Sequence, residues 1–370
     1  MVNAIQKIND LRDYLSYKFV EREEIVEGIL LAILAKQHVL LVGPPGTAKS
    51  NLVSELAKHI TGGNYFQWLL SRFSTPEELF GPVSLQGLEK GIYKRNTLNK
   101  LPESHIAFID EIFKSNSAIL NAMLTLINER IFYNDGQPIT SPLMTVVGAS
   151  NEYPEDGENL EALFDRFLLR YHVDYIGEDN HFISMLKGIS PKSPMPLSIN
   201  EITELQLYTA MVNIPNSVLE VLLQIRNKLK DEGIRPSDRR FKQSLNIIRA
   251  NAFLKQRNTV EYSDLAVLSH SLWETVDQSE KVKVIVKEFC TDKLKFQLDQ
   301  YFNDANEQFE IVRKQQTAES ALEATKKMKD ILHSISLLKP QYPARVNECE
   351  EVEKKVKIAL SKVAEAAIGI

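Results

Sequence analysis

The sequence predicts an α/β core with a parallel sheet and helices on both faces, followed by an all-helical lid domain and a C-terminal helical extension. Three observations support this fold class. The N-terminal third alternates apolar, strand-like runs with helix-like segments, an order typical of parallel sheets with helical crossovers. Strand patterns fade after about residue 177, where helical spacing takes over. From about residue 283 the chain is amphipathic and rich in Lys, Glu and Gln.

The elements follow in order along the chain. Apolar runs predict strands over residues 39–42, 106–109 and 143–148. A β-hairpin is expected near residues 81–95, with its turn at Gly87–Gly91. Helical spacing predicts helices over residues 5–15, 25–34, 52–60, 118–130, 160–169, 218–229, 239–254 and 263–273. Prolines at positions 191, 194 and 196 mark a linker, so we expect a core over 1–190, a helical domain over 191–282 and an extension over 283–370.

Composition limits the class of protein. The 370 residues contain 44 Lys and Arg and 49 Asp and Glu, a net charge of −5 that gives nucleic acid no overall attraction. The two cysteines, Cys290 and Cys349, lack metal-type spacing, which is typical of a reducing compartment. No apolar run is long enough to span a membrane and the N-terminus has no signal-peptide core, so we expect a cytoplasmic protein.

The segment that follows the first strand predicts a phosphate-binding loop. Its glycines and prolines can turn backbone N–H groups toward a phosphate, at the positive end of the next helix. Lys49 can reach the β- and γ-phosphates, and the Ser50 hydroxyl can bind Mg²⁺. The motif usually has glycine before this lysine, whereas here Ala48 stands there. A methyl group is tolerated if that residue is helical, but is strained if the backbone needs positive φ. The predicted nucleotide-binding residues are Gly43, Pro44, Pro45, Gly46, Thr47, Ala48, Lys49, Ser50 and Asn51.

Polar residues end the next two buried strands. Asp110 is positioned to bind Mg²⁺, and Glu111 to polarise a water molecule for attack on the γ-phosphate. Asn151 follows the third strand and could hold that water or contact the γ-phosphate. The alternatives are an ordinary strand-to-loop boundary for the carboxylates and a local turn for the amide.

Arginines provide the charge that a phosphoryl-transfer transition state requires. Arg166 lies on the short helix after the third strand, and its alternative role is a surface ion pair with Asp165. Arg170, four residues on, is the rival candidate.

A second pair of arginines opens a helix in the helical domain. Ser237 or Asp238 can cap this helix, and Arg239 and Arg240 follow. Because adjacent helical residues point apart, one should face the interdomain cleft and the nucleotide, and we favour Arg239. The alternative is that both are solvated.

Together these motifs resemble the AAA+ ATPases and, within them, the MoxR family. GPPGTAKS resembles Walker A, IAFIDE Walker B, GASN sensor 1, LFDRF the arginine-finger helix and SDRRF sensor 2. Alanine before the Walker A lysine also occurs in that family. RFSTPEELFGP and SDRRFKQS resemble the RavA branch (regulatory ATPase variant A), and the likeness covers roughly residues 1–280.

The resemblance implies ATP and Mg²⁺ as ligands. It makes Glu111 the catalytic base, Asn151 sensor 1 and Arg239 sensor 2, with Arg166 as a finger supplied to the neighbouring subunit. A finger acting in trans implies a homo-oligomeric ring, expected to be hexameric. The family further implies a partner with a von Willebrand factor A (vWA) domain and chaperone-like remodelling of a protein substrate.

Two other classes of function stay open at this point. A scaffold that assembles on ATP without needing turnover is disfavoured because Glu111 is present. A DNA-linked motor would use a basic stripe near the expected hairpin, which a solvated hairpin explains as well; these residues are Lys90, Lys94, Arg95 and Lys100.

Overall fold

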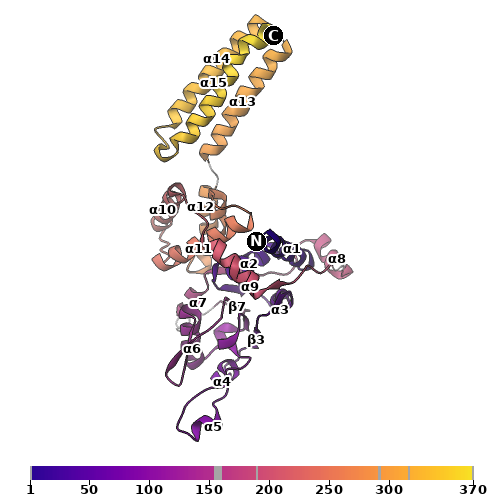
Figure 1. Ribbon diagram of the computed structural model, residues 1–370, viewed down its shortest axis with the longest axis vertical. Coiled ribbons are helices and arrows are strands. Elements are labelled where there is room, and N and C mark those ends of the chain that lie inside the picture. The colour runs from indigo at the N-terminus through magenta and orange to yellow at the C-terminus, as the bar shows by residue number, and fades with distance from the viewer. Residues whose placement is uncertain (1, 154–160, 189–190, 291–292, 316, 369–370) are drawn as a thin grey trace. The chain divides into compact units, whose positions relative to one another are not determined.

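The computed structural model describes residues 2–153, 161–188, 191–290, 293–315 and 317–368 (Figure 1). The chain forms two compact units. The first comprises residues 1–214 and 226–286, and the second residues 215–225 and 287–370. The first unit contains both the expected core and most of the expected helical domain, so the boundary between those two stays a prediction.

A five-stranded parallel sheet forms the centre of the first unit, in the order β3–β4–β7–β1–β8. Its strands are β1 (Val39–Val42), β3 (Tyr65–Leu69), β4 (Ile106–Asp110), β7 (Thr145–Ser150) and β8 (Leu169–His172). Val42 lies opposite Ser150, and Ile109 lies opposite Gly148, so β1, β4 and β7 end at one edge. We call this the carboxyl edge, and the edge where the strands begin the amino edge.

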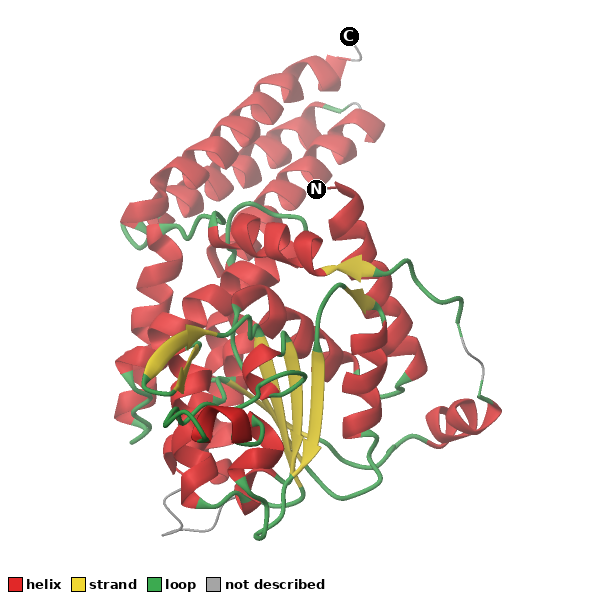
Figure 2. Cartoon of the chain, turned by 60° about the horizontal axis from the view of Figure 1, so that its bottom comes forward, coloured by secondary structure: helices red, strands yellow, loops and turns green. Residues whose placement is uncertain are grey.

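Helices cover both faces of this sheet, which confirms the predicted fold class (Figure 2). In α2, ten of 13 residues are buried, including the apolar run Ile29–Ala35. Burying such side chains stabilises the fold by about 1.5–3 kcal/mol each. The helices of this unit are α1 (Val2–Lys18), α2 (Glu23–Ala35), α3 (Lys49–Lys58), α4 (Pro76–Phe80), α5 (Leu85–Leu88), α6 (Ser117–Glu129), α7 (Glu161–Arg166), α8 (Asp179–Lys187), α9 (Ile199–Ala210), α11 (Asp238–Leu254) and α12 (Ser279–Cys290), which ends in the second unit. Short 3₁₀ turns are η1 (Leu101–Glu103), η2 (Ile112–Lys114), η3 (Tyr262–His270) and η4 (Val276–Gln278), and a small parallel pair joins β2 (Ile60–Thr61) to β9 (Leu197–Ser198).

The prediction of a β-hairpin near residues 81–95 is wrong. Val83 and Arg95 form a single antiparallel bridge, and α5 lies between them. The Ser84 hydroxyl accepts a hydrogen bond from the Gly87 N–H at 3.2 Å, which caps a helix where a strand was expected.

The hairpin of this unit lies instead at β5 (Ile131–Asn134) and β6 (Gln137–Thr140). Asp135 and Gly136 connect the strands with φ of 55° and 71°. Asp-Gly between two strand-like runs is a strong hairpin signal because both central residues of a type I′ turn need positive φ. The sequence therefore contained this signal, although the prediction placed the hairpin elsewhere.

Two strands of the sheet were not predicted. β3 is an edge strand of alternating burial, and β8 contains a buried arginine in place of an apolar residue. Neither pattern resembles the continuous apolar runs Val39–Val42 of β1 and Ile106–Ile109 of β4.

The second unit is helical, as predicted for the extension. α13 (Lys293–Gln315), α14 (Ala318–Leu338) and α15 (Val346–Ile368) pack against one another, with η5 (Pro343–Arg345) before the last helix (Figure 1). Their shared core contains buried side chains such as Leu298, Met328 and Val356. Another helix, α10 (Asn216–Asp231), begins in this unit and ends in the first.

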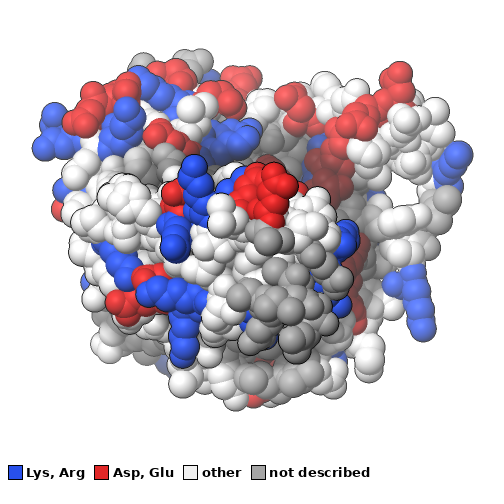
Figure 3. Space-filling model, turned by 90° about the horizontal axis from the view of Figure 1, so that it is seen from above, with Lys and Arg blue, Asp and Glu red and all other residues white. Residues whose placement is uncertain are grey.

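Charges of both signs are mixed over the surface. Lys and Arg lie among Asp and Glu on the face drawn in Figure 3, and neither sign covers it alone. Among the helices that the structure describes, none combines the length and apolarity needed to cross a bilayer.

Candidate functional site

The loop between β1 and α3 begins with a close backbone approach. The Gly43 N–H donates to the Ser150 carbonyl at 3.1 Å, which ties the loop to the end of β7. A Cβ at Gly43 would lie 2.0 Å from the carbonyl oxygen of Val173, so only glycine fits here. Gly46 has a φ of 82°, which also favours glycine. These two residues fix the turn, and α3 begins at Lys49 with its N-terminal N–H groups uncapped by a side chain.

The Lys49 ammonium group folds back into this loop. It donates to the carbonyl oxygens of Gly43 at 2.7 Å and Pro44 at 2.9 Å, and to the Thr47 hydroxyl at 3.3 Å. Burial lowers the pKa of Lys49, opposed by the charges of Asp110 and Glu111. A polyanion at the start of α3 would give this cation a better partner than neutral carbonyls.

Ala48 has positive φ, the case in which its methyl group is strained. Its φ and ψ are 64° and 21°, in the left-handed region directly before α3. For a residue with a Cβ this conformation costs roughly 1–2 kcal/mol. The chain therefore keeps the glycine-type backbone of the motif without the glycine.

The predicted polar residues meet at the carboxyl edge. The Asn151 amide, beyond β7, donates a hydrogen bond to Glu111 Oε1, and Lys114 Nζ lies 3.3 Å from Glu111 Oε2. Glu111 has a φ of 51°, and its N–H donates to Asp110 Oδ1 at 3.0 Å. The left-handed turn thus lets two consecutive residues present both carboxylates at the end of β4.

The donor set fits Mg²⁺ held mainly by a phosphate ligand. Burial raises the pKa of Asp110, so its charged form gains from a nearby cation. No group of three or more His, Cys, Asp or Glu among the described residues could hold a metal alone. Mg²⁺ commonly takes one or two protein ligands together with phosphates and water. Ser50 and Asp110 would supply those ligands.

Arg170 is buried within the fold and is not available to a neighbouring molecule. Its guanidinium donates to the carbonyl oxygens of Phe167 at 3.1 Å, Phe164 at 3.0 Å and Trp273. It also lies 3.8 Å from the centre of the Phe164 ring, and the residue is 3% exposed. Between the two candidates for a finger, the structure therefore favours Arg166.

Arg240 is buried too, so the alternative of two solvated arginines is wrong. It is 1% exposed and donates to the carbonyl oxygens of Ser271 at 2.8 Å, Leu168 at 2.9 Å and Phe167 at 3.2 Å. It also pairs with the Asp165 carboxylate at 3.2 Å. A signal for this was present in the sequence, because Arg240 shares the helical spacing of Ser244, Ile247 and Ile248 on the buried face of α11.

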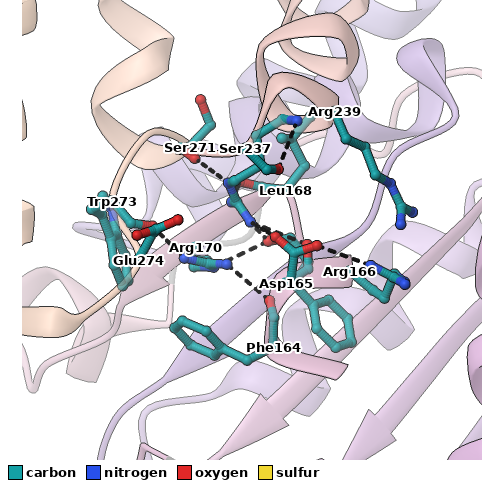
Figure 4. Close-up of polar contacts among 12 residues, drawn as sticks. Phe164, Asp165, Arg166, Leu168, Arg170, Ser237, Arg239, Ser271, Trp273 and Glu274 are labelled. Atoms are coloured by element: carbon teal, nitrogen blue, oxygen red, sulfur yellow. Dashed lines mark hydrogen bonds and ion pairs between the residues drawn. The ribbon is translucent and has the colours of Figure 1, made fainter. Parts of the chain in front are cut away.

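Arg166 and Arg239 lie together on one side of the molecule. Arg166 pairs with Asp165 at 2.9 Å, so the ion pair given as its alternative role is present, and Arg239 donates to Asn128 Oδ1 at 2.5 Å. Both side chains extend toward the same side in Figure 4. Burial, and then the charge of Arg166, lower the pKa of Arg239.

This side is the amino edge of the sheet. Arg166 precedes the first residue of β8 by three positions, and the residue before Asn128, Ile127, accepts a hydrogen bond from His38 at 3.1 Å. His38 directly precedes β1, whereas Lys49 follows its other end. A four-residue strand separates these edges by about 13 Å. Arg239 therefore does not reach the phosphate loop of its own chain, contrary to the expectation that it crosses the interdomain cleft.

A cavity of about 650 Å³ lies along the outer side of β8. Residues before and within α2 line it together with β8 and the segment around η3 and η4. No residue of the phosphate loop is among those lining it. One lining residue, His172, lies opposite Val42, which directly precedes the loop. Lining residues include Arg22, Ile25, Tyr171, His172, His270 and Trp273.

Comparison with known proteins shows which families the sequence matches. Residues 6–208 match the family described as the MoxR domain in the MoxR-vWA-beta-propeller ternary systems, and residues 217–286 match an AAA lid domain. An uncharacterised protein of Methanocaldococcus jannaschii is 40% identical over 279 residues, which cover 75% of this chain and 73% of that protein. The chaperone MoxR1 of Mycobacterium tuberculosis is 25% identical over 213 residues, 56% of this chain and 55% of that protein.

A solved structure from Cytophaga hutchinsonii, provisionally described as an ATPase, has a similar fold. Its TM-score is 0.63 at 19% identity, over 77% of this chain and 95% of that one. At this identity the similarity shows the fold alone. The MoxR-domain match, in contrast, spans more than half of the chain. The chain therefore belongs to the MoxR family of AAA+ ATPases.

Proposed function

We propose that this protein hydrolyses ATP with Mg²⁺ at sites shared between neighbouring copies in a ring, and that turnover drives remodelling of a partner protein. Lys49 and Ser50 would hold the phosphates and Mg²⁺, with Asp110 as the second metal ligand. Glu111, oriented by the Asn151 amide, would accept the proton of the attacking water.

The observation that carries this proposal is the separation of the cations from the loop. Arg166 and Arg239 lie at the amino edge, whereas Lys49 and Glu111 lie at the carboxyl edge. Burial, and then the charge of the half-exposed Arg166, lower the pKa of the exposed Arg239, so an anion bound beside these arginines would stabilise both charges. The phosphates of a neighbouring copy are such an anion, so we assign both arginines to act in trans.

Ring assembly and remodelling rest on the family. We expect a hexamer and a partner with a vWA domain, because the matching family is described within MoxR-vWA-beta-propeller systems. Placement in the RavA branch remains a prediction from the motifs alone. An ATP-dependent scaffold is the second candidate, and measured turnover separates the two.

A DNA-linked motor is disfavoured because part of the basic stripe that it would use makes contacts within the chain. Arg95 pairs with Glu77 at 3.0 Å and donates to the Gly81 carbonyl at 2.9 Å. Lys100 donates to the Glu78 carbonyl at 3.0 Å and lies over the Trp68 ring. Two of the four cations of the proposed stripe thus stabilise the fold through contacts within the chain.

Mixing two inactive variants tests the shared site. Glu111→Gln removes the base, and Arg166→Ala removes the finger, whose loss should reduce turnover by about 10³–10⁵. In a mixed ring, some sites combine an intact Glu111 with an intact Arg166 from the neighbour. We expect phosphate release to recover on mixing, and likewise for Glu111→Gln with Arg239→Ala.

Arg166→Lys mixed with Arg166→Ala is the matched control, since no interface then contains the arginine. No recovery in the Glu111→Gln mixtures, with each single variant inactive, would show that the arginines act within their own chain. Turnover that is independent of protein concentration in the unmodified protein would also contradict a ring.

A further inference from the structure

Helix α8 (Asp179–Lys187) is exposed along its whole length. None of its nine residues is buried, although it carries four large apolar side chains. Phe182, Ile183, Met185 and Leu186 are 48%, 48%, 44% and 67% exposed. Phe182, Met185 and Leu186 follow the i, i+3, i+4 spacing and form one continuous apolar face. An isolated helix of this length is marginal in water, so its order depends on contacts with other segments.

One carboxylate holds the start of this helix. Glu21, just before α2, accepts hydrogen bonds from the N–H groups of Gly177 at 2.8 Å and Glu178 at 3.0 Å. It also pairs with His181 Nδ1 at 3.0 Å. These bonds fix the first turn of α8 and leave the apolar face uncovered.

The helix is anchored beside the phosphate loop. The Tyr175 hydroxyl, four residues before α8, donates to the Pro45 carbonyl at 3.3 Å. Arg22, next to Glu21, donates to the carbonyl of Asp174. The segment leading into α8 therefore touches the loop that would bind the phosphates, at the carboxyl edge of the sheet.

We propose that the apolar face of α8 docks onto a second copy of this chain, on the surface around Arg166 and Arg239. This rests on the proposed function, because a neighbour whose arginines reach the phosphate loop must cover the carboxyl edge, where α8 is attached.

Charge at the two surfaces supports this choice of occupant. Asp174, Glu178 and Asp179 are exposed at the entry to α8. On the other surface Arg239 and Lys242 are exposed and three residues apart on α11, so they share a helix face. Arg166 lies beside Arg239 and adds to the positive charge, which Asp165 and the exposed Asp238 offset in part. The acidic rim of one copy thus complements the basic face of the next.

A double substitution tests the apolar contact. Phe182→Ser with Leu186→Ser removes the face without altering the Glu21 contacts. On a Glu111→Gln background with ATP, mass photometry over a protein concentration series should show the assembly midpoint rising by about tenfold or more, a loss of at least one decade in affinity. Leu85→Ser with Leu88→Ser, two exposed apolar residues on α5, is the matched control and should not shift it.

Charge reversal identifies the surface that α8 meets. Glu178→Lys and Lys242→Glu should each weaken assembly alone, and an equimolar mixture should regain it because opposite charges then meet. ATP binding by dilute monomer confirms that each variant is folded.

An unchanged midpoint for the Phe182/Leu186 variant would overturn the docking proposal. So would a mixture no better than its components, since the charges would then not face each other. If the unmodified chain fails to assemble at all, the proposed ring itself is wrong. A ring that forms and shows recovery in the Glu111→Gln and Arg166→Ala mixture, but ignores the α8 substitutions, overturns only the docking.

Discussion

The Asn151 amide donates a hydrogen bond to the Glu111 carboxylate, so that residues beyond β7 and β4 meet at the carboxyl edge of the sheet. Lys114 approaches the second oxygen of the same carboxylate at 3.3 Å. Glu111 is therefore oriented by two groups from different segments before any water or nucleotide binds. This arrangement suits a catalytic base whose carboxylate must keep one orientation toward the attacking water.

Glu111→Gln should abolish turnover while leaving ATP binding close to that of the unmodified protein. Glutamine has nearly the same shape and can still accept from Asn151, but it cannot accept a proton, a function worth about 10²–10⁴ in rate. Phosphate release and equilibrium binding of a fluorescent ATP analogue measure the two properties. Asn151→Ala should lower turnover by less, since the base survives without its orienting partner. Turnover within twofold of the unmodified protein in Glu111→Gln would remove this residue from the chemistry.

Ala48→Gly should stabilise the nucleotide-free protein by up to about 1 kcal/mol. Relief of the left-handed alanine contributes roughly 1–2 kcal/mol, and the greater freedom of glycine in the unfolded chain offsets part of it. Urea denaturation followed by circular dichroism checks the sign. Ala57→Gly, inside α3, is the control and should destabilise by about 0.5–1 kcal/mol. Equal losses for both substitutions would show that Ala48 is not strained.

Substitutions of the adjacent arginines of α11 should have different effects, one on stability and the other on turnover. Arg240→Ala should lower the free energy of unfolding by about 3–5 kcal/mol, since the buried carbonyls of Ser271 and Leu168 lose this donor and Asp165 keeps Arg166 alone. Arg239→Ala should change stability by less than about 1 kcal/mol, because its contact is exposed, yet should greatly reduce turnover. Denaturation curves and phosphate release on the same samples separate the two effects. Similar stability losses for both variants would contradict the burial described here.

Stability should fall with pH below about 6.5 through His38. Its Nδ1 accepts from the Val146 N–H at 2.9 Å and its Nε2 donates to the Ile127 carbonyl, so the neutral ring fits and burial holds its pKa well below the usual value. The unfolded state then binds the extra proton, and each pH unit below 6.5 costs up to about 1.4 kcal/mol.

His38→Gln should remove this contribution to the slope, measured by urea denaturation between pH 7.5 and 5.5. Burial also lowers the pKa of His105 and His270, so the difference between the two proteins is the informative quantity. Parallel stability profiles would show that His38 does not titrate on unfolding.

Much of the candidate site could be predicted from the sequence. An apolar run followed by glycines, prolines and a lysine specifies a strand, a turn and a helix by local rules. Asp110, Glu111 and Asn151 then come together because parallel strands end at a common edge. These inferences need only the chain order and the geometry of a parallel sheet.

The arginines show what the sequence could not decide. Whether each of these arginines is free to contact a ligand or a neighbouring copy depends on carbonyl groups and carboxylates from distant segments. The Trp273 carbonyl, for example, accepts a hydrogen bond from Arg170, 103 residues away in the sequence. Local capping and turn contacts likewise decided that a helix forms within residues 81–95, where a hairpin was expected, and that Ala48 has positive φ. The sequence by itself determined the fold class and the chemistry at the end of β1, since both follow from local patterns. Only the tertiary structure decided which charges are buried and at which edge the others lie, because burial and pairing arise from contacts between distant parts of the chain.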